Sequence, residues 1–168
     1  MLTSHELLGF MSPTLALEIL TYAYDTDKPL YRATLSAVAD ARKLRPVFLE
    51  RQPRPQRHAT MLATLARPAM EVVTANLIRT WLLKQHKQML VDFLDALGIP
   101  HQEGVVEDLP PTMDDAKIRA AVDALLAKYP PETVAVYLHA FNEMNAVGWP
   151  NLNTMLETDP RLQLGGAS

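Results

Sequence analysis

The side chains best suited to chemistry in this chain are the cations between residues 42 and 57, a stretch that we call the basic segment. A guanidinium group presents a planar fork of N–H donors, and this shape matches carboxylate and phosphate oxygens. Within the segment only Glu50 opposes the positive charge, and three prolines favour an extended, exposed backbone. The six cations of the basic segment are Arg42, Lys43, Arg45, Arg51, Arg54 and Arg57.

The charge of the whole chain is divided unevenly around this segment. Residues 42–87 carry ten Lys and Arg against two Asp and Glu, whereas the remainder carries six against seventeen. The formal net charge of −3 therefore averages a basic stretch with a strongly acidic remainder. A chain built in this way has one cationic element available to meet an acidic surface.

Three interpretations of the basic segment are open. Its cations can pair with acidic side chains of residues 92–132, within the chain or across an oligomer. They can dock on an acidic partner protein, or they can bind nucleic-acid phosphates, which would make binding steeply salt dependent. The isoelectric point near 5.9 and the single aromatic residue among the arginines, Phe48, count against nucleic acid. We therefore predict docking on acidic protein surface, with a second copy of the chain, and hence a homo-oligomer, among the outcomes.

A second group of polar residues lies on a predicted helix near the C-terminus. His139 and Glu143 are four residues apart, so they share a helical face with Asn142 close by, and such a pair can bind a small ligand or act as an acid and a base. The chain contains no Glu-x-x-His pair and no second histidine at the spacing of a zinc site. We expect an exposed surface pair without metal, and keep a ligand-binding or catalytic bundle centred on these residues as the alternative.

The motifs of common enzyme classes are absent from the sequence. Neither G-x-G-x-x-G nor G-x-x-x-x-G-K occurs, and with six glycines in all there is no phosphate-cradling loop to expect. G-x-S-x-G is also missing, and the lack of cysteine removes thiolate catalysis and Cys-ligated zinc. These absences favour a protein that is not an enzyme and carries no cofactor.

The sequence offers no feature that would place the chain in a membrane. The longest uncharged stretches, residues 7–17 and 144–156, are shorter than the roughly 18–20 apolar residues that a span requires. No Lys or Arg precedes the apolar patch of the first ten residues, so we expect no secretory signal. We predict a cytoplasmic protein without a membrane partner.

The elements that must position these residues are helices. Apolar residues recur at helical spacing, prolines stand where those patterns begin or stop, and no stretch alternates like a strand. We predict an all-α protein, an irregular bundle of six to eight mostly antiparallel helices, in one domain of residues 1–164 with a disordered tail at 165–168. The longest helix is expected around residues 68–97, either bent or broken near His86, and ended by Gly98 and Pro100.

Smaller expectations concern single side chains near these elements. Residues 45–57 should be a connector with at most one short turn of helix, in which Val47, Phe48 and Leu49 form a small apolar core. Asn76, Arg79 and His86 should lie on the less buried flank of the long helix. We expect His58, which follows the basic segment, to be exposed to solvent.

Overall fold

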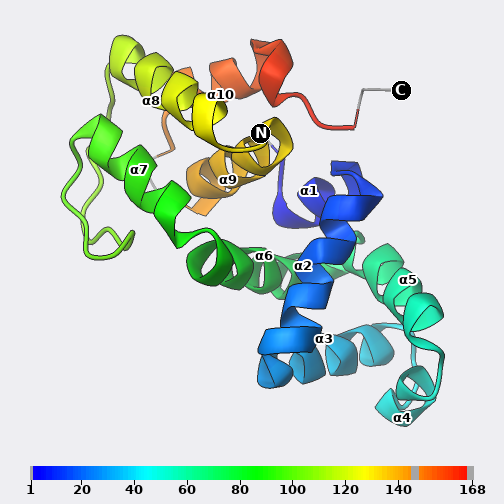
Figure 1. Ribbon diagram of the computed structural model, residues 1–168. Helices are drawn as coiled ribbons and strands as arrows, with labels where there is room; N and C mark the ends of the chain where they lie inside the picture. The colour runs from blue at the N-terminus through cyan, green and yellow to red at the C-terminus, as the bar shows by residue number, and fades with distance from the viewer. Residues whose placement is uncertain (1, 145–147, 166–168) are drawn as a thin grey trace. The chain divides into compact units, whose positions relative to one another are not determined.

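The computed structural model describes residues 2–144 and 148–165, and this described part is all-helical (Figure 1). It contains ten α-helices, two short 3-10 turns and no strand, with one isolated bridge between Gln102 and Val105. The predicted all-α class is confirmed, whereas the predicted count of six to eight helices is too low. One helix missed from the sequence, α1 (Ser4–Phe10), is too short to show a full apolar period, whereas α4 (Pro46–Glu50) is the short turn of helix allowed for in the basic segment.

The prediction of one long helix around residues 68–97 is wrong, and the alternative of a break near His86 is correct. The stretch begins with the 3-10 turn η1 (Pro68–Met70), continues as α6 (Glu71–Gln85) and resumes as α7 (Lys87–Leu97). His86 separates the two helices with φ −121° and ψ 30°, outside the helical region. Gly98 ends α7 in the left-handed conformation with φ 70°, as its position in the sequence predicts.

The chain divides into two compact units, and the boundary between them falls inside α6. Residues 3–81 form the N-terminal unit, and Leu2 with residues 82–165 forms the C-terminal unit. The apolar residues of the 68–97 stretch do not keep to one helical face, because the part before residue 82 packs into one unit and the part after it into the other. The predicted single domain of residues 1–164 stays a prediction, and residues 166–168 of the predicted tail lie outside the described residues.

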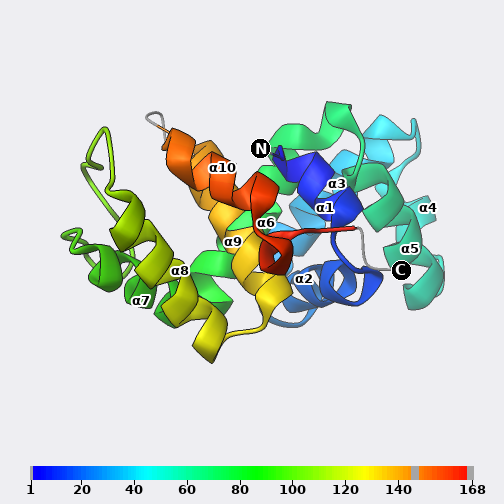
Figure 2. The ribbon, with the colours of Figure 1, turned by 90° about the horizontal axis from the view of Figure 1, so that it is seen from above.

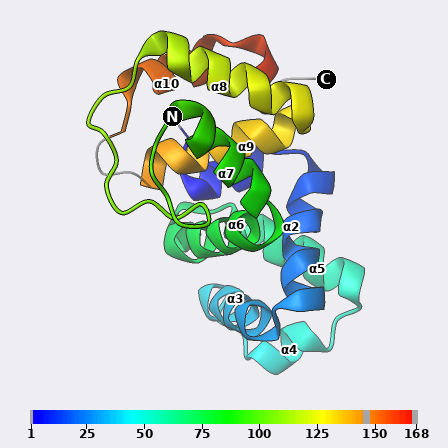
Figure 3. The ribbon, with the colours of Figure 1, turned by 60° about the vertical axis from the view of Figure 1, so that its left-hand side comes forward.

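The N-terminal unit is built on helices with well-defined starts. Ser12 and Asp27 each accept a hydrogen bond from the backbone N–H three residues on, at 3.1 and 3.2 Å, and a proline follows in each first turn. The helices α2 and α3 pack on each other and on α5, and α3 also contacts α4 (Figure 3). The unit comprises α1, α2 (Pro13–Thr26), α3 (Lys28–Ala41), α4, α5 (Arg54–Leu65), η1 and the first part of α6.

A contact distant in sequence fixes α1 in this unit. The Glu71 carboxylate accepts hydrogen bonds at 2.8 Å from the backbone N–H groups of Ser4 and His5, which have no partner inside the first turn of their helix. A negative charge at a helix N-terminus is also favoured by the helix dipole. The start of α6 therefore holds the start of α1.

The C-terminal unit surrounds α9, whose residues 133–140 are all buried. Helix α7 packs along α8, and α9 contacts α8, α10 and the last 3-10 turn (Figure 2). On the surface, the Asp92 carboxylate of α7 accepts hydrogen bonds from Lys128 at 2.8 Å and from the Tyr129 hydroxyl at 2.5 Å. The unit comprises α7, α8 (Asp115–Lys128), α9 (Pro131–Met144), α10 (Pro150–Thr158) and η2 (Pro160–Leu162).

Candidate docking surface

The basic segment leaves α3 through a strained turn. Lys43 has φ 57°, and the N–H of Leu44 donates to the carbonyl of Ala39 at 2.8 Å, which closes the end of the helix. Glycine usually occupies this position, because a side chain in the left-handed region costs about 1–2 kcal/mol. The chain therefore carries a cation at a position where its backbone would favour glycine.

Helix α4 is the single short helix expected in the segment, but its apolar residues do not form the predicted core. Leu49 is fully buried, whereas the Phe48 side chain is 53% exposed and Val47 is 40% exposed. Leu44, just before α4, is 40% exposed as well. The prediction of a small apolar core is correct only for Leu49, which anchors α4. Three large apolar side chains are thereby left at the surface among the cations.

Arg57 differs from the other cations of the basic segment because it holds the local structure. Its Nε donates to the Tyr31 hydroxyl oxygen at 2.9 Å, and its Nη1 donates to the Glu50 carbonyl at 3.0 Å. The side chain is half-buried and joins α3 and α5 to the turn that follows α4. Arg57 therefore contributes to the fold, and its charge is already engaged.

His58 is buried, so the expectation of a solvent-exposed histidine is wrong. Only 3% of the residue is accessible, and its Nε2 lies 2.9 Å from the hydroxyl oxygen of Tyr31. Burial lowers the pKa of His58 to about 4, and the charges of Arg57 and Arg54 lower it further against a small opposing effect of Asp25. The imidazole is therefore neutral at physiological pH, and its Nε2 shares a hydrogen bond with the Tyr31 hydroxyl.

The remaining cations of the basic segment are exposed. The Arg54 guanidinium lies 5.2 Å from the centroid of the Tyr24 ring, a cation–π distance. Arg42 donates to the Thr64 hydroxyl at 3.3 Å. The side chains of Lys43, Arg45 and Arg51 make no hydrogen bond or ion pair within the N-terminal unit. No carboxylate of that unit pairs with any of the six cations.

The predicted polar group on α9 has a different arrangement from the expected exposed pair. His139 is only 5% accessible and its Nδ1 accepts from the Leu2 N–H at 3.4 Å, while burial lowers its pKa to about 4. Asn142 is buried too, where it accepts from the Trp149 N–H at 2.8 Å and donates to the side-chain oxygen of Asn153. Glu143 is half-buried. Asn142 is thus engaged in fixing the start of α10.

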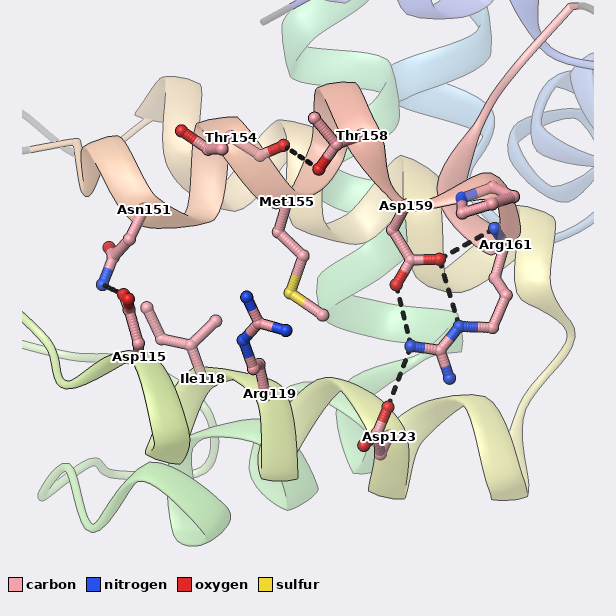
Figure 4. A pocket seen from close by; sticks show the side chains of 11 residues that line it. Asp115, Ile118, Arg119, Asp123, Asn151, Thr154, Met155, Thr158, Asp159 and Arg161 are labelled. Carbon is pink, nitrogen blue, oxygen red and sulfur yellow. Dashed lines mark hydrogen bonds and ion pairs between the residues drawn. The ribbon is translucent and has the colours of Figure 1, made fainter.

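Reasoning from sequence missed a pocket between α8 and α10 with a volume of about 510 Å³ (Figure 4). Arg161 bridges Asp159 at 2.7 Å and Asp123 at 2.9 Å across one end of it. At the other end Asn151 donates to the Asp115 carboxylate at 2.6 Å. Much of the charge in this pocket is therefore neutralised internally, and only the fold brings the residues of α8 and α10 together.

Asn76 and Arg79 are exposed, as expected, and they line a groove of about 500 Å³ between α3 and α6. Val72 stands on the same groove with 82% of its surface exposed. His86 is half-buried at the break between α6 and α7. The three residues of the predicted flank are therefore not gathered into one polar site.

Two further features, a metal-binding cluster and a membrane-spanning helix, were sought in the described part of the chain. Within it, no three potential metal-binding side chains converge, and no helix has the length and apolar character of a membrane span. Comparison with known protein families, with curated proteins and with solved structures gives no match.

Proposed function

We propose that the chain is a non-enzymatic interaction protein whose basic segment docks on an acidic segment of another protein chain. The observation that carries this proposal is the coincidence of unengaged cations and exposed apolar side chains in one short stretch. Lys43, Arg45 and Arg51 are exposed beside Phe48 and Val47. Cations around an apolar centre are the arrangement of a recognition surface with a polar rim.

The two kinds of side chain have separate roles in such a contact. Full burial of a Phe, Val or Leu side chain contributes about 1.5–3 kcal/mol, so covering the exposed parts of Leu44, Val47 and Phe48 contributes about 2–3 kcal/mol. The cations at the rim act mainly on the rate of association and on the choice of partner. We therefore expect weak, rapid binding that falls steeply with salt, because charges at the surface are screened within about 10 Å at 0.1 M salt.

The backbone at Lys43 supports the same proposal. Its left-handed conformation would be less costly for glycine, yet the position carries a charge. Residues held in costly conformations cluster at functional sites more often than elsewhere. We leave Arg57 out of the proposed docking surface, because its side chain donates hydrogen bonds to Tyr31 and to the Glu50 carbonyl.

The test uses fluorescence anisotropy with a labelled peptide composed of Glu, Asp, Leu and Phe. The wild-type chain should bind it at low salt, and the double variant R45E/R51E should bind about tenfold more weakly or worse. The matched control is R32E/R67E, which makes the same change of charge at two exposed positions of the same unit. A peptide with Gln and Asn in place of the acids should not bind.

Nucleic acid is the competing ligand for the same arginines. Single-stranded nucleic acid is usually held by several aromatic side chains that stack on bases, whereas the basic segment offers Phe48 alone. A labelled oligonucleotide is therefore titrated in parallel. Tighter binding of the oligonucleotide than of the acidic peptide, or equal peptide binding by R45E/R51E and R32E/R67E, would overturn the proposal.

A further inference from the structure

The C-terminal unit contains a pocket with acidic side chains at its edge and apolar side chains inside, so its charge is opposite to that of the basic segment. It lies between the end of α7 and the start of α8, with a volume of about 530 Å³, and we call it the loop pocket. Leu97 and Ile99 are buried at its floor, and the half-buried Leu109 and Met113 line its walls. A hollow of this size, with apolar side chains inside and polar ones at its edge, can accept a large side chain or a small ligand.

The loop pocket is held open by contacts from outside it. The left-handed Gly98 turns the chain away from α7 at one side. On the other side the Trp149 indole N–H donates to the Pro110 carbonyl at 2.9 Å, and Asn151 donates to the Met113 carbonyl at 2.7 Å. These bonds tie the wall formed by residues 109–113 to the start of α10, so the cavity is formed before any ligand arrives.

The rim of the loop pocket carries more acidic than basic side chains, because Lys117 is the one cation among the residues that line it. Asp108 and Asp114 line the pocket and are exposed, and Glu107 is exposed next to Asp108. Asp114 accepts a hydrogen bond from the Lys117 N–H at 3.2 Å. Among the described residues of the C-terminal unit, Glu107 and Asp108 have no hydrogen-bond or ion-pair partner, although the neighbouring Glu103 is paired with Lys87 at 2.9 Å.

The charges of the two units are also opposite. Residues 3–81 carry ten Lys and Arg against seven Asp and Glu, whereas residues 82–168 carry six against twelve. Two copies of the chain therefore attract each other when the N-terminal unit of one approaches the C-terminal unit of the other. Val105, which is 58% exposed on the same loop as Glu107, adds apolar surface beside the acids.

We propose that the occupant of the basic segment is the loop pocket of a second copy of this chain. Phe48 of one copy enters between Leu109 and Met113 of the other, and Arg45 and Arg51 face Glu107 and Asp108. This inference rests on the proposed function, since it names the partner of the same surface. The contact joins unlike surfaces, so the assembly either closes when copies exchange contacts or continues head to tail.

The opposite charges of the two proposed surfaces allow a test in which the charges of each surface are reversed. Sedimentation velocity over a range of protein concentrations at low salt should show mass rising with concentration for the wild type and falling back when salt is added. The variants R45E/R51E and E107K/D108K should each associate about tenfold more weakly or worse, because like charges then meet. R32E/R67E makes the same change of net charge outside the basic segment and is the control, so R45E/R51E should weaken association much more than R32E/R67E does.

Mixing the two reversed variants in equal amounts should restore association, and so should one chain that carries all four substitutions. Such a rescue shows that both variants fold and that the two surfaces meet. Phe48→Ser should weaken association without changing its dependence on salt.

Three outcomes would overturn the inference. One is a wild-type chain that stays a single chain at every concentration, another is association that R45E/R51E leaves intact, and the third is a mixture that fails to associate. The acidic-peptide assay keeps this failure separate from that of the proposed function. If the peptide binds wild type but not R45E/R51E while the chain does not self-associate, docking on acidic protein stands and self-recognition fails.

Discussion

Acidification from pH 6.5 to pH 4 should destabilise the N-terminal unit through His58. The pKa of this side chain falls from 6.5 in the unfolded chain to about 4 in the folded one. Between these values the unfolded state binds one proton more, so the free energy of unfolding decreases as pH falls. The contribution is fully present above pH 6.5 and is lost by pH 4, and 2.5 pH units at about 1.4 kcal/mol each give about 3.5 kcal/mol.

The assay exploits the position of the two tryptophans, one buried in each unit. Trp81 lies at the end of the N-terminal unit and Trp149 in the C-terminal unit. In a Trp149→Phe background, tryptophan fluorescence during urea unfolding reports on Trp81 alone. The free energy of unfolding is measured from pH 7 to pH 4 for this chain and for its His58→Gln derivative, whose amide keeps a hydrogen-bonding end near Tyr31.

The expected result is a difference in slope. The chain with His58 should lose up to about 1.4 kcal/mol per pH unit more than the Gln derivative inside this window. The imidazole lies beside Tyr31, Arg57 and Arg54, and Asp25 is the carboxylate that opposes the lowering of its pKa. Equal slopes for the two chains, or an NMR titration that places the His58 pKa near 6.5, would refute the reasoning from burial.

Three further predictions concern single substitutions, all measured by chemical unfolding. Asp92→Asn should lower the free energy of unfolding by about 1 kcal/mol at neutral pH. The hydrogen bond from Lys128, followed by that from Tyr129, lowers the pKa of Asp92 to about 2, so the ionised carboxylate stabilises the fold above pH 4. That contribution should fade between pH 4 and pH 2. Arg57→Ala should cost about 1–3 kcal/mol through its lost hydrogen bonds, whereas Arg51→Ala should change stability by less than about 0.5 kcal/mol; equal costs would contradict the division of roles. Lys43→Gly should stabilise the N-terminal unit by up to about 1 kcal/mol while weakening acidic-peptide binding, and a destabilised variant would argue against strain at this position.

The helices were predictable where the signal is local. Ser12, Asp27 and Gly98 act within a few residues of their own position, and the structure has each cap where the sequence places it. The break at His86 was open from the sequence, because an apolar stripe that drifts around a helix fits a bend as well as a break. The structure decides it, because His86 has backbone angles outside the helical region.

The burial of histidines was not predictable, because it depends on partners far along the chain. His58 is buried and hydrogen-bonded to Tyr31, which lies 27 residues earlier, and His139 accepts a hydrogen bond from Leu2, 137 residues earlier. Neither partner leaves a local mark in the sequence. Glu71 is a similar case, since it caps a helix that begins 67 residues before it.

For the candidate site, residue type and spacing identified the cationic stretch but not how its members are used. The sequence treats Arg57 and Arg51 alike, and only the structure separates the residue that holds a turn from the one at the surface. Phe48 and Leu49 are adjacent apolar residues of α4. Only one side of this helix packs on α3, so Leu49 is buried and Phe48 is exposed. The loop pocket depends on Trp149 and Asn151, more than thirty residues from the wall that they hold.

The prolines that start α4 and α5 have a consequence for how the segment withstands proteases. Pro46 directly follows Arg45, and Pro55 directly follows Arg54, so trypsin, which cleaves after cations but not before proline, is blocked at both bonds. Cleavage within the basic segment is thereby confined to the bonds after Arg42, Lys43 and Arg51 and, inside α5, to the bond after Arg57. A molecule bound to the basic segment should protect those bonds from trypsin, so the set of protected bonds would locate its binding site.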